Sequence, residues 1–110
     1  MSLLEEIHDS QFDEKVLKSF LPVVLDCMSP ECIICKTMDE RLKEVARTSQ
    51  GLANFFKINV NTNKVWQEFV VKVVPTLLYF KNGNLVSRGE NFPDKEEIVR
   101  RLNELRLIKT

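Results

Sequence analysis

Residues 26–36 read DCMSPECIICK, and the interpretation of the whole sequence depends on this stretch. It places three cysteines, Cys27, Cys32 and Cys35, within nine positions, and the last two have the spacing C-x-x-C. An apolar run typical of a buried strand precedes them, and a helical pattern follows. Three explanations fit such a cluster: a redox-active dithiol, part of a metal or iron–sulfur site, or cysteines that only pack in the core.

The composition is that of an ordinary globular protein. The chain has 110 residues, of which 44% are hydrophobic and 29% charged. Lysine plus arginine and aspartate plus glutamate both total 16, so the formal net charge is zero and nothing indicates a nucleic-acid partner. Repeats and Pro/Gly-rich linkers are absent from the sequence. We therefore predict one domain over residues 1–110, and we expect a monomer.

The N-terminal sequence MSLLEEIH has neither the basic start nor the apolar run of a signal peptide. The longest apolar stretches, 20–25 and 73–80, each contain a proline and are shorter than the roughly 20 residues of a membrane span. We expect a cytoplasmic protein with no membrane contact. In a reducing compartment, a C-x-x-C pair is more often catalytic or metal-binding than structural.

The expected strands are four or five in number. Residues 23–28 and 55–60 are apolar or β-branched almost throughout, as in strands that are covered on both faces. Residues 76–80 and 85–88 flank an Asn-Gly pair, which is a strong signal for a β-hairpin. A further short strand fits residues 3–8.

Helices are expected between these strands and after the last one. Asp9-Ser10 can cap a short first helix that Pro22 stops, and a second helix begins at Cys32. A short helix follows 61–63, and 94–97 resembles the capping box of the last one. The alternation predicts an α/β fold with a central mixed sheet and helices on both faces. Helical spacing assigns these residues to the buried faces: Phe12, Val16, Leu17 and Phe20; Ile34, Met38, Leu42, Val45 and Ala46; Ile98, Val99, Leu102 and Leu105.

The order of these motifs resembles that of the thioredoxin family over nearly the whole chain. A strand that ends in Asp26 leads to C-x-x-C-K at 32–36, then to KIN at 57–59 and to VPT at 74–76, which runs into LLYFKNG. The resemblance implies the thioredoxin fold, in which the dithiol lies at a strand-to-helix junction. It also implies a cis peptide bond between Val74 and Pro75, against the dithiol.

The position of the cysteines suggests their roles. Unpaired backbone N–H groups and the helix dipole favour a thiolate at the first turn of a helix. Cys32 is therefore the expected nucleophile, and Cys35, one turn further along and more buried, the thiol that resolves the mixed disulfide. The redox group is the Cys32–Cys35 pair itself, so we expect no separate cofactor and no metal ion.

Asp26 interrupts an apolar strand, where a carboxyl group is expected to have a raised pKa. The resemblance places it behind the dithiol and close to Lys57 on the neighbouring strand. Such a carboxylate can accept the proton of Cys35 as Cys35 attacks, with Lys57 as its modulator. The alternatives are an exposed strand-end residue and a purely structural ion pair with Lys57.

Several positions depart from the family pattern. Ile33 and Ile34 replace Gly-Pro, Glu31 stands where a tryptophan normally precedes the motif, Met28 takes an aromatic position and Val73 replaces a glycine. The carboxylate of Glu31 disfavours a neighbouring thiolate, so we predict a less reactive Cys32 than the usual motif has.

We expect an extended substrate peptide to bind beside the cis-proline, at the surface formed by Ile33, Val73, Val74 and Pro75. The alternative is that the valines are ordinary core residues.

The spacing of Cys27, Cys32 and Cys35 also matches three ligands of a plant-type [2Fe–2S] loop. A fourth cysteine is lacking, and His8, the only histidine, lies far away in the sequence. Cys27 should instead point away from Asp26 and pack in the core.

The sequence therefore predicts a thioredoxin-like thiol–disulfide oxidoreductase, a protein-disulfide reductase in type. Its expected partners are protein disulfide substrates and an electron donor that resembles thioredoxin reductase. Two alternatives stay open: a thioredoxin-fold adaptor that no longer turns over and, less favoured, an iron–sulfur protein.

Overall fold

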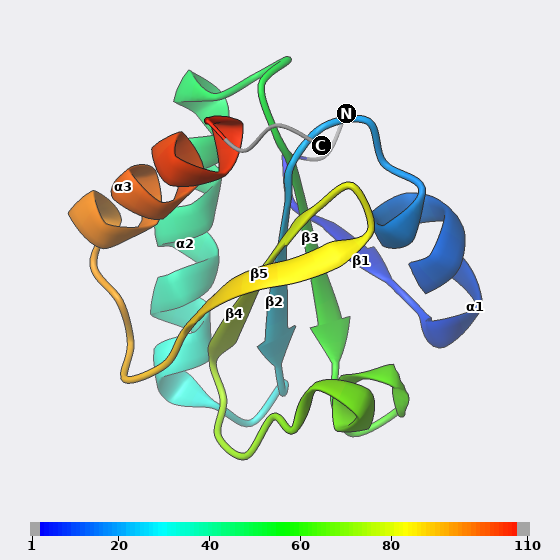
Figure 1. Ribbon diagram of the computed structural model, residues 1–110. Helices are drawn as coiled ribbons and strands as arrows, with labels where there is room; N and C mark the ends of the chain where they lie inside the picture. The colour runs from blue at the N-terminus through cyan, green and yellow to red at the C-terminus, as the bar shows by residue number, and fades with distance from the viewer. Residues whose placement is uncertain (1–2, 108–110) are drawn as a thin grey trace.

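The computed structural model describes residues 3–107 and contains a five-stranded mixed sheet (Figure 1). The strand order across the sheet is β1-β3-β2-β4-β5. β1 and β2 both run parallel to β3, whereas β4 is antiparallel to both β2 and β5. The strands are β1 (Glu5–Ile7), β2 (Val23–Met28), β3 (Asn54–Asn59), β4 (Thr76–Lys81) and β5 (Asn84–Gly89). The strand that leads to the cysteines is therefore the central one, and the predicted mixed sheet is confirmed.

Helices cover both faces of this sheet, as predicted (Figure 1). The long helices α2 (Ile33–Thr48) and α3 (Lys95–Arg106) lie together on one face. The other face carries α1 (Asp9–Phe12), which continues as the π-helical turn η1 (Asp13–Leu17), and the 3₁₀ helix η2 (Val65–Phe69). The fold is the α/β arrangement that the sequence predicted.

Two hydrophobic cores result, because successive side chains of a strand point to opposite faces. From β2, Val24 packs beneath α2 and α3, whereas Leu25 and Cys27 belong to the core on the other face. In that second core the rings of Phe12, Phe69 and Phe80 lie with their centroids 5.3–5.8 Å apart. Residue 26 therefore points toward the side of the sheet that α2 covers.

The hairpin between β4 and β5 follows the local signal. Asn82 and Gly83 have φ angles of 51° and 80°, the pair of positive values that a two-residue type I′ turn requires. A Cβ atom on Gly83 would lie 3.0 Å from the backbone oxygen of Leu17, so a side chain there would also crowd the end of η1.

Three residues assigned to buried helix faces are exposed instead. Phe20 is 97% exposed because the first helical segment ends at Leu17 and Phe20 lies in the turn beyond it. Ile34 is 46% exposed, since Cys35 takes the buried position in the first turn of α2. Val99 lies beside Ile98 but on the outer side of α3, and is 38% exposed.

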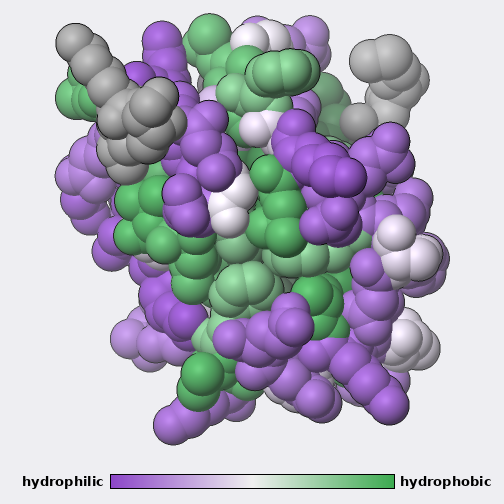
Figure 2. Space-filling model, turned by 45° about the vertical axis from the view of Figure 1, so that its right-hand side comes forward, coloured by the Kyte–Doolittle hydropathy of each residue, from purple (hydrophilic) through white to green (hydrophobic). Residues whose placement is uncertain are grey.

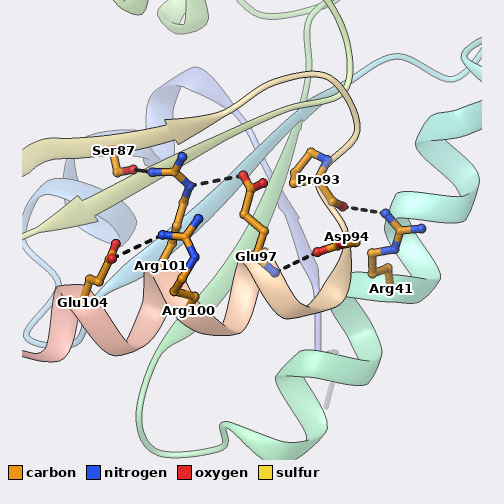
Figure 3. Close-up of polar contacts among 8 residues, drawn as sticks. All are labelled: Arg41, Ser87, Pro93, Asp94, Glu97, Arg100, Arg101 and Glu104. Atoms are coloured by element: carbon orange, nitrogen blue, oxygen red, sulfur yellow. Dashed lines mark hydrogen bonds and ion pairs between the residues drawn. The ribbon is translucent and has the colours of Figure 1, made fainter.

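The start of α3 is held by a polar network (Figure 3). Asp94 caps the helix as predicted, since its carboxylate accepts the backbone N–H of Glu97 at 2.9 Å. The carboxylate of Glu97 takes a different partner from the one a capping box implies, namely Arg101 at 3.3 Å. Arg101 also donates to the hydroxyl of Ser87 on β5, so the network joins the helix to the sheet edge.

Asp9-Ser10 was predicted to cap the first helix, and this is wrong, because both residues lie inside the helix. The helix is capped by His8, whose backbone N–H donates to Gln11 Oε1 at 2.9 Å. The carboxylate of Asp9 instead accepts the backbone N–H groups of Lys64 and Val65, at 2.7 and 2.9 Å, where η2 begins.

Hydrophilic residues surround a central band of hydrophobic ones on the face drawn in Figure 2. None of the helices within residues 3–107 is long and apolar enough to cross a membrane. Large hydrophobic side chains that remain exposed in the described chain are Phe20, Ile33, Ile34, Leu52, Val70, Val73, Val86, Val99 and Leu107. Ile33 and Ile34 lie in the first turn of α2, and Val70 and Val73 lie in the segment between η2 and β4.

Candidate active site

Cys32 and Cys35 form a disulfide at the junction between β2 and α2. Their Cα atoms are 5.2 Å apart, and the junction lies at the lower end of the sheet in Figure 1. Cys32 is the N-cap of α2, and its sulfur accepts the backbone N–H of Cys35 at 3.1 Å. In the reduced protein the same N–H group favours a thiolate at Cys32. Cys32 therefore lies at the helix N-terminus, as predicted, and its role as the nucleophile stays a prediction.

The two sulfur-bearing residues differ in exposure. Cys35 is only 3% exposed, as predicted for the resolving thiol, whereas Cys32 is half-buried. The Cys32 sulfur also lies 3.9 Å from the backbone oxygen of Val74. An attacking group from outside therefore reaches Cys32 first.

The four residues predicted to bind substrate lie around this sulfur. The peptide bond between Val74 and Pro75 is cis, as the resemblance implied. Ile33 is 81% exposed and Val73 51% exposed, so these two are surface residues rather than core residues. Val74 is half-buried and Pro75 buried.

Asp26 is fully buried on the face of β2 that points toward α2. Among the described residues, neither of its carboxylate oxygens has a hydrogen-bond partner. Burial raises the pKa of Asp26 to about 8; the negative charge of Asp39 adds to the rise, and the positive charge of Lys57 opposes it. An exposed strand-end position is therefore ruled out.

Lys57 lies opposite Asp26 in the register of β2 and β3, but its ammonium contacts a different carboxylate. The Lys57 Nζ atom is 3.1 Å from Asp39 Oδ1, and Lys43 Nζ is 3.3 Å from Asp39 Oδ2. Asp39 was missed in the sequence. The signal was available, because Asp39 lies one helical turn after Cys35 and so shares its side of α2.

Comparison with known proteins agrees with this geometry. The Thioredoxin family model matches residues 4–104 of the chain. The chain belongs to the thioredoxin family. It is 32% identical to a thioredoxin of Haemophilus influenzae over 105 residues, which cover 94% of this chain and 98% of that protein. It is also 32% identical to thioredoxin 1 of Nostoc sp. over 87 residues, with 78% of this chain and 81% of that protein covered.

A third relative comes from Caenorhabditis elegans. A probable thioredoxin-2 of Caenorhabditis elegans is 33% identical over 88 residues, which cover 79% of this chain and 61% of that protein. Membership of the thioredoxin family and the disulfide between Cys32 and Cys35 together confirm the predicted thiol–disulfide oxidoreductase.

Two pockets flank the dithiol of this thioredoxin-family protein. One has a volume of about 390 Å³, and Cys35, Asp39 and Lys57 contribute to its walls. It gives solvent a route to the buried side of the dithiol. The other has a volume of about 270 Å³ and runs beside the cis-proline segment; its walls include Asn61, Trp66, Val71, Lys72, Val73 and Val74.

Glu31, which stands in the position of the usual tryptophan, is held at the rim of the second pocket. The side-chain amide of Asn61, one of the residues that line this pocket, donates to both carboxylate oxygens of Glu31, at 2.7 and 3.0 Å. The carboxylate next to Cys32 therefore has a defined position in the fold.

Cys27 does not join the other two cysteines. It is fully buried in the core on the opposite face of the sheet, with Leu25 and Ile58, as predicted. Burial raises the pKa of its thiol to about 12, and the nearby carboxyl of Asp26 contributes to the rise. Within residues 3–107, no three histidine, cysteine, aspartate or glutamate side chains are grouped so that they could hold a metal ion.

Proposed function

We propose that this protein reduces disulfide bonds in other proteins, with Cys32 as the nucleophile and Cys35 as the resolving thiol. The observation that carries the proposal is the Cys32–Cys35 disulfide at the N-terminus of α2, with the backbone N–H of Cys35 directed at the Cys32 sulfur.

The first step begins from the reduced pair. The Cys32 thiolate attacks one sulfur of the substrate disulfide, a new S–S bond forms, and the substrate bond breaks. The second substrate sulfur leaves as a thiolate and takes a proton from solvent. The product is a mixed disulfide between Cys32 and the substrate.

The second step uses the buried side of the site. Asp26, in its carboxylate form, accepts the proton of the Cys35 thiol, through water. The Cys35 thiolate attacks the Cys32 sulfur, the mixed disulfide breaks, and the remaining substrate sulfur leaves and is protonated. Two electrons have then moved from the pair to the substrate, and Asp26 returns its proton to solvent.

Substrate binding is assigned to the surface of Ile33, Val73, Val74 and Pro75. The exposed side chains of Ile33 and Val73 offer apolar contacts, and the Val74 carbonyl beside the Cys32 sulfur offers a backbone partner for an extended peptide. The apolar rim that Ile33 and Val73 create favours substrates with hydrophobic residues next to the disulfide.

Each turnover leaves the pair oxidised, so a second dithiol must reduce it again. We assign this role to a donor of the thioredoxin-reductase type and propose that no further cofactor takes part. Because the cytoplasm keeps thiols reduced, we propose that the protein acts there. We also propose that it is a monomer with a single domain over residues 1–110.

The test is the reduction of insulin by dithiothreitol, followed as the precipitation of the free B chain. Wild type should accelerate the reaction, and Cys32→Ser should return it to the rate without protein. Cys27→Ala is the matched control, because it removes a cysteine from the other core and should retain the wild-type rate. Equal background rates for wild type and Cys32→Ser would contradict the proposal and favour an adaptor without turnover.

A further inference from the structure

Lys57 lies between two acidic residues and contacts only one of them closely. On β2, Asp26 is its register partner, whereas Asp39 reaches it from α2. The ammonium is 3.1 Å from Asp39 Oδ1, while Asp26 is left without a hydrogen-bond partner in the described part of the chain. Lys43 occupies the second oxygen of Asp39 at 3.3 Å. Asp39 is thus fixed from two sides.

The ion pair of Asp39 and Lys57 is shielded from solvent. The side chains are 20% and 21% exposed, which sets the pair apart from surface pairs such as Lys95 with Glu44, at 45% and 56%. Charges that are mostly removed from water are screened less by salt and interact more strongly. The pair can therefore hold the ammonium of Lys57 in one position.

We propose that Asp39 is a positioning residue of the exchange reaction: it binds Lys57 beside the pocket that reaches Cys35 and so keeps the ammonium away from Asp26. The inference rests on the role of proton acceptor proposed above for Asp26. It extends that role to a residue of α2 whose carboxylate pairs with Lys57 and Lys43.

Few other charged groups around Asp26 could change the pKa of its carboxyl. Lys57 comes from β3, and Asp39 and Lys43 come from α2. The α2 residues Lys36 and Glu40 line the same pocket but are exposed, Cys27 lies on the other face of β2, and β4 presents Leu77 opposite Asp26.

The consequence concerns the pH at which the site works. With Lys57 held by Asp39, the buried Asp26 keeps its proton near neutral pH, and the carboxylate that forms at higher pH is a strong acceptor for the Cys35 proton. If Asp39 were neutral, Lys57 would be free to approach Asp26 and would stabilise its carboxylate. The carboxylate would then form at lower pH and would be a weaker base.

The test follows the carboxyl carbon of Asp26 by ¹³C NMR during a pH titration of the reduced protein. Asp39→Asn should lower the titration midpoint by about one pH unit, the lower end of the effect of an opposite charge at close range. Glu40→Gln is the matched control, since it removes a carboxylate from the next position of α2, and its midpoint should equal that of wild type. An unchanged midpoint in Asp39→Asn would overturn the inference.

Lys57→Met separates the two ways in which Asp39 can act. In this background Asp39→Asn should shift the midpoint less than in wild type, because there is no ammonium to release. An equal shift in both backgrounds would show that Asp39 acts only by its own charge, and would overturn the positioning role. Dispersed amide spectra of each variant confirm that the fold is retained.

Kinetics distinguish failure of this inference from failure of the proposed function. The resolution rate of the mixed disulfide should rise with pH in wild type, and its midpoint should fall in Asp39→Asn together with the NMR midpoint. Asp26→Asn should slow resolution and remove this pH dependence. If Asp26→Asn left both unchanged, Asp26 would not be the proton acceptor, whatever the NMR titration shows, and the catalytic part of the inference would fall with it.

Discussion

The two long helices of this protein begin in the same way and are used differently. At α2 the Cys32 sulfur accepts the backbone N–H of Cys35 at 3.1 Å, and at α3 the Asp94 carboxylate accepts that of Glu97 at 2.9 Å. Both caps therefore lie in the positive field of a helix N-terminus. The field stabilises a permanent anion at α3, and at α2 it stabilises a group that can be a thiol, a thiolate or half of a disulfide.

The surroundings of the two helix N-termini differ as well. The first turn of α3 carries Glu96 and Glu97, and arginines complete the network around it (Figure 3). The first turn of α2 carries no acidic residue, and the carboxyl of Asp26 lies buried beneath α2 without a partner among the residues described. At the N-terminus of α3 the charged groups are paired and stabilise the fold. At the other, unsatisfied groups are available for chemistry.

The largest effect, on the rate of disulfide exchange, is expected when Cys32 is replaced by serine, an ordinary N-cap residue. Cys32→Ser retains an acceptor for the N–H of Cys35 but removes the nucleophile. Exchange should fall to the background rate, whereas the free energy of unfolding should stay within about 1 kcal/mol of that of the reduced wild type. The insulin assay measures the exchange rate, and urea unfolding monitored by circular dichroism measures the free energy of unfolding. A large loss of stability would show that the sulfur has a structural role that serine cannot replace.

Asp26→Asn tests the raised pKa of the buried carboxyl through the pH dependence of the free energy of unfolding. In the folded protein Asp26 holds its proton up to pH about 8, whereas in the unfolded chain it loses the proton near 3.8. Folding therefore takes up a proton between these values, and the stability of wild type falls as pH rises from about 4 to 8. Asparagine never ionises, so the variant avoids this loss.

The advantage of Asp26→Asn in free energy of unfolding should widen across this pH window and then stay constant. It should reach several kcal/mol, since one pKa unit corresponds to about 1.4 kcal/mol. Urea unfolding between pH 4 and pH 9 measures the advantage, and Glu40→Gln, which changes an exposed carboxylate, is the control. A constant difference between variant and wild type would mean that Asp26 ionises at its ordinary pH.

A moderate effect is expected at the structural cap. Asp94→Ala should lower the free energy of unfolding by about 1 kcal/mol, because the N–H of Glu97 loses its acceptor. Insulin reduction should proceed at the wild-type rate, and Asp94→Ser should recover most of the stability. Loss of exchange in a folded Asp94→Ala protein would contradict the separation of the two helix starts.

The smallest effect is expected at Glu31, whose carboxylate lies next to Cys32 and is held by Asn61. Glu31→Gln removes the negative charge and keeps the shape. The apparent pKa of Cys32, measured as the pH dependence of its alkylation, should fall by only a few tenths of a unit, because Glu31 is exposed and its charge is screened. A rise in this value would show that the carboxylate does not oppose the thiolate.

Much of the fold could be predicted because its signals are local. The strand 23–28, the Asn82-Gly83 turn and the Asp94 cap depend on residues that are neighbours in sequence, and all three are confirmed. The cis bond before Pro75 came only from the resemblance, since spacing does not specify an isomer.

Residues were wrongly assigned to buried helix faces where they lie near the end of a helix or at the edge of its buried face. Phe20 lies just beyond a helix that ends early, and Ile34 lost the buried position to its neighbour Cys35. Periodicity alone does not separate adjacent residues in the first turn of a helix.

The sequence by itself determined that a C-x-x-C pair starts a helix after a buried strand, and that this strand carries a carboxyl group near its end. Only the tertiary structure decided which charges meet there. Lys57 pairs with Asp39, 18 positions away, rather than with Asp26, and Asp9 caps a segment 55 positions further on. The backbone of a helix or turn follows from near neighbours, whereas the partner of a charged side chain depends on which elements the packing of the sheet brings together.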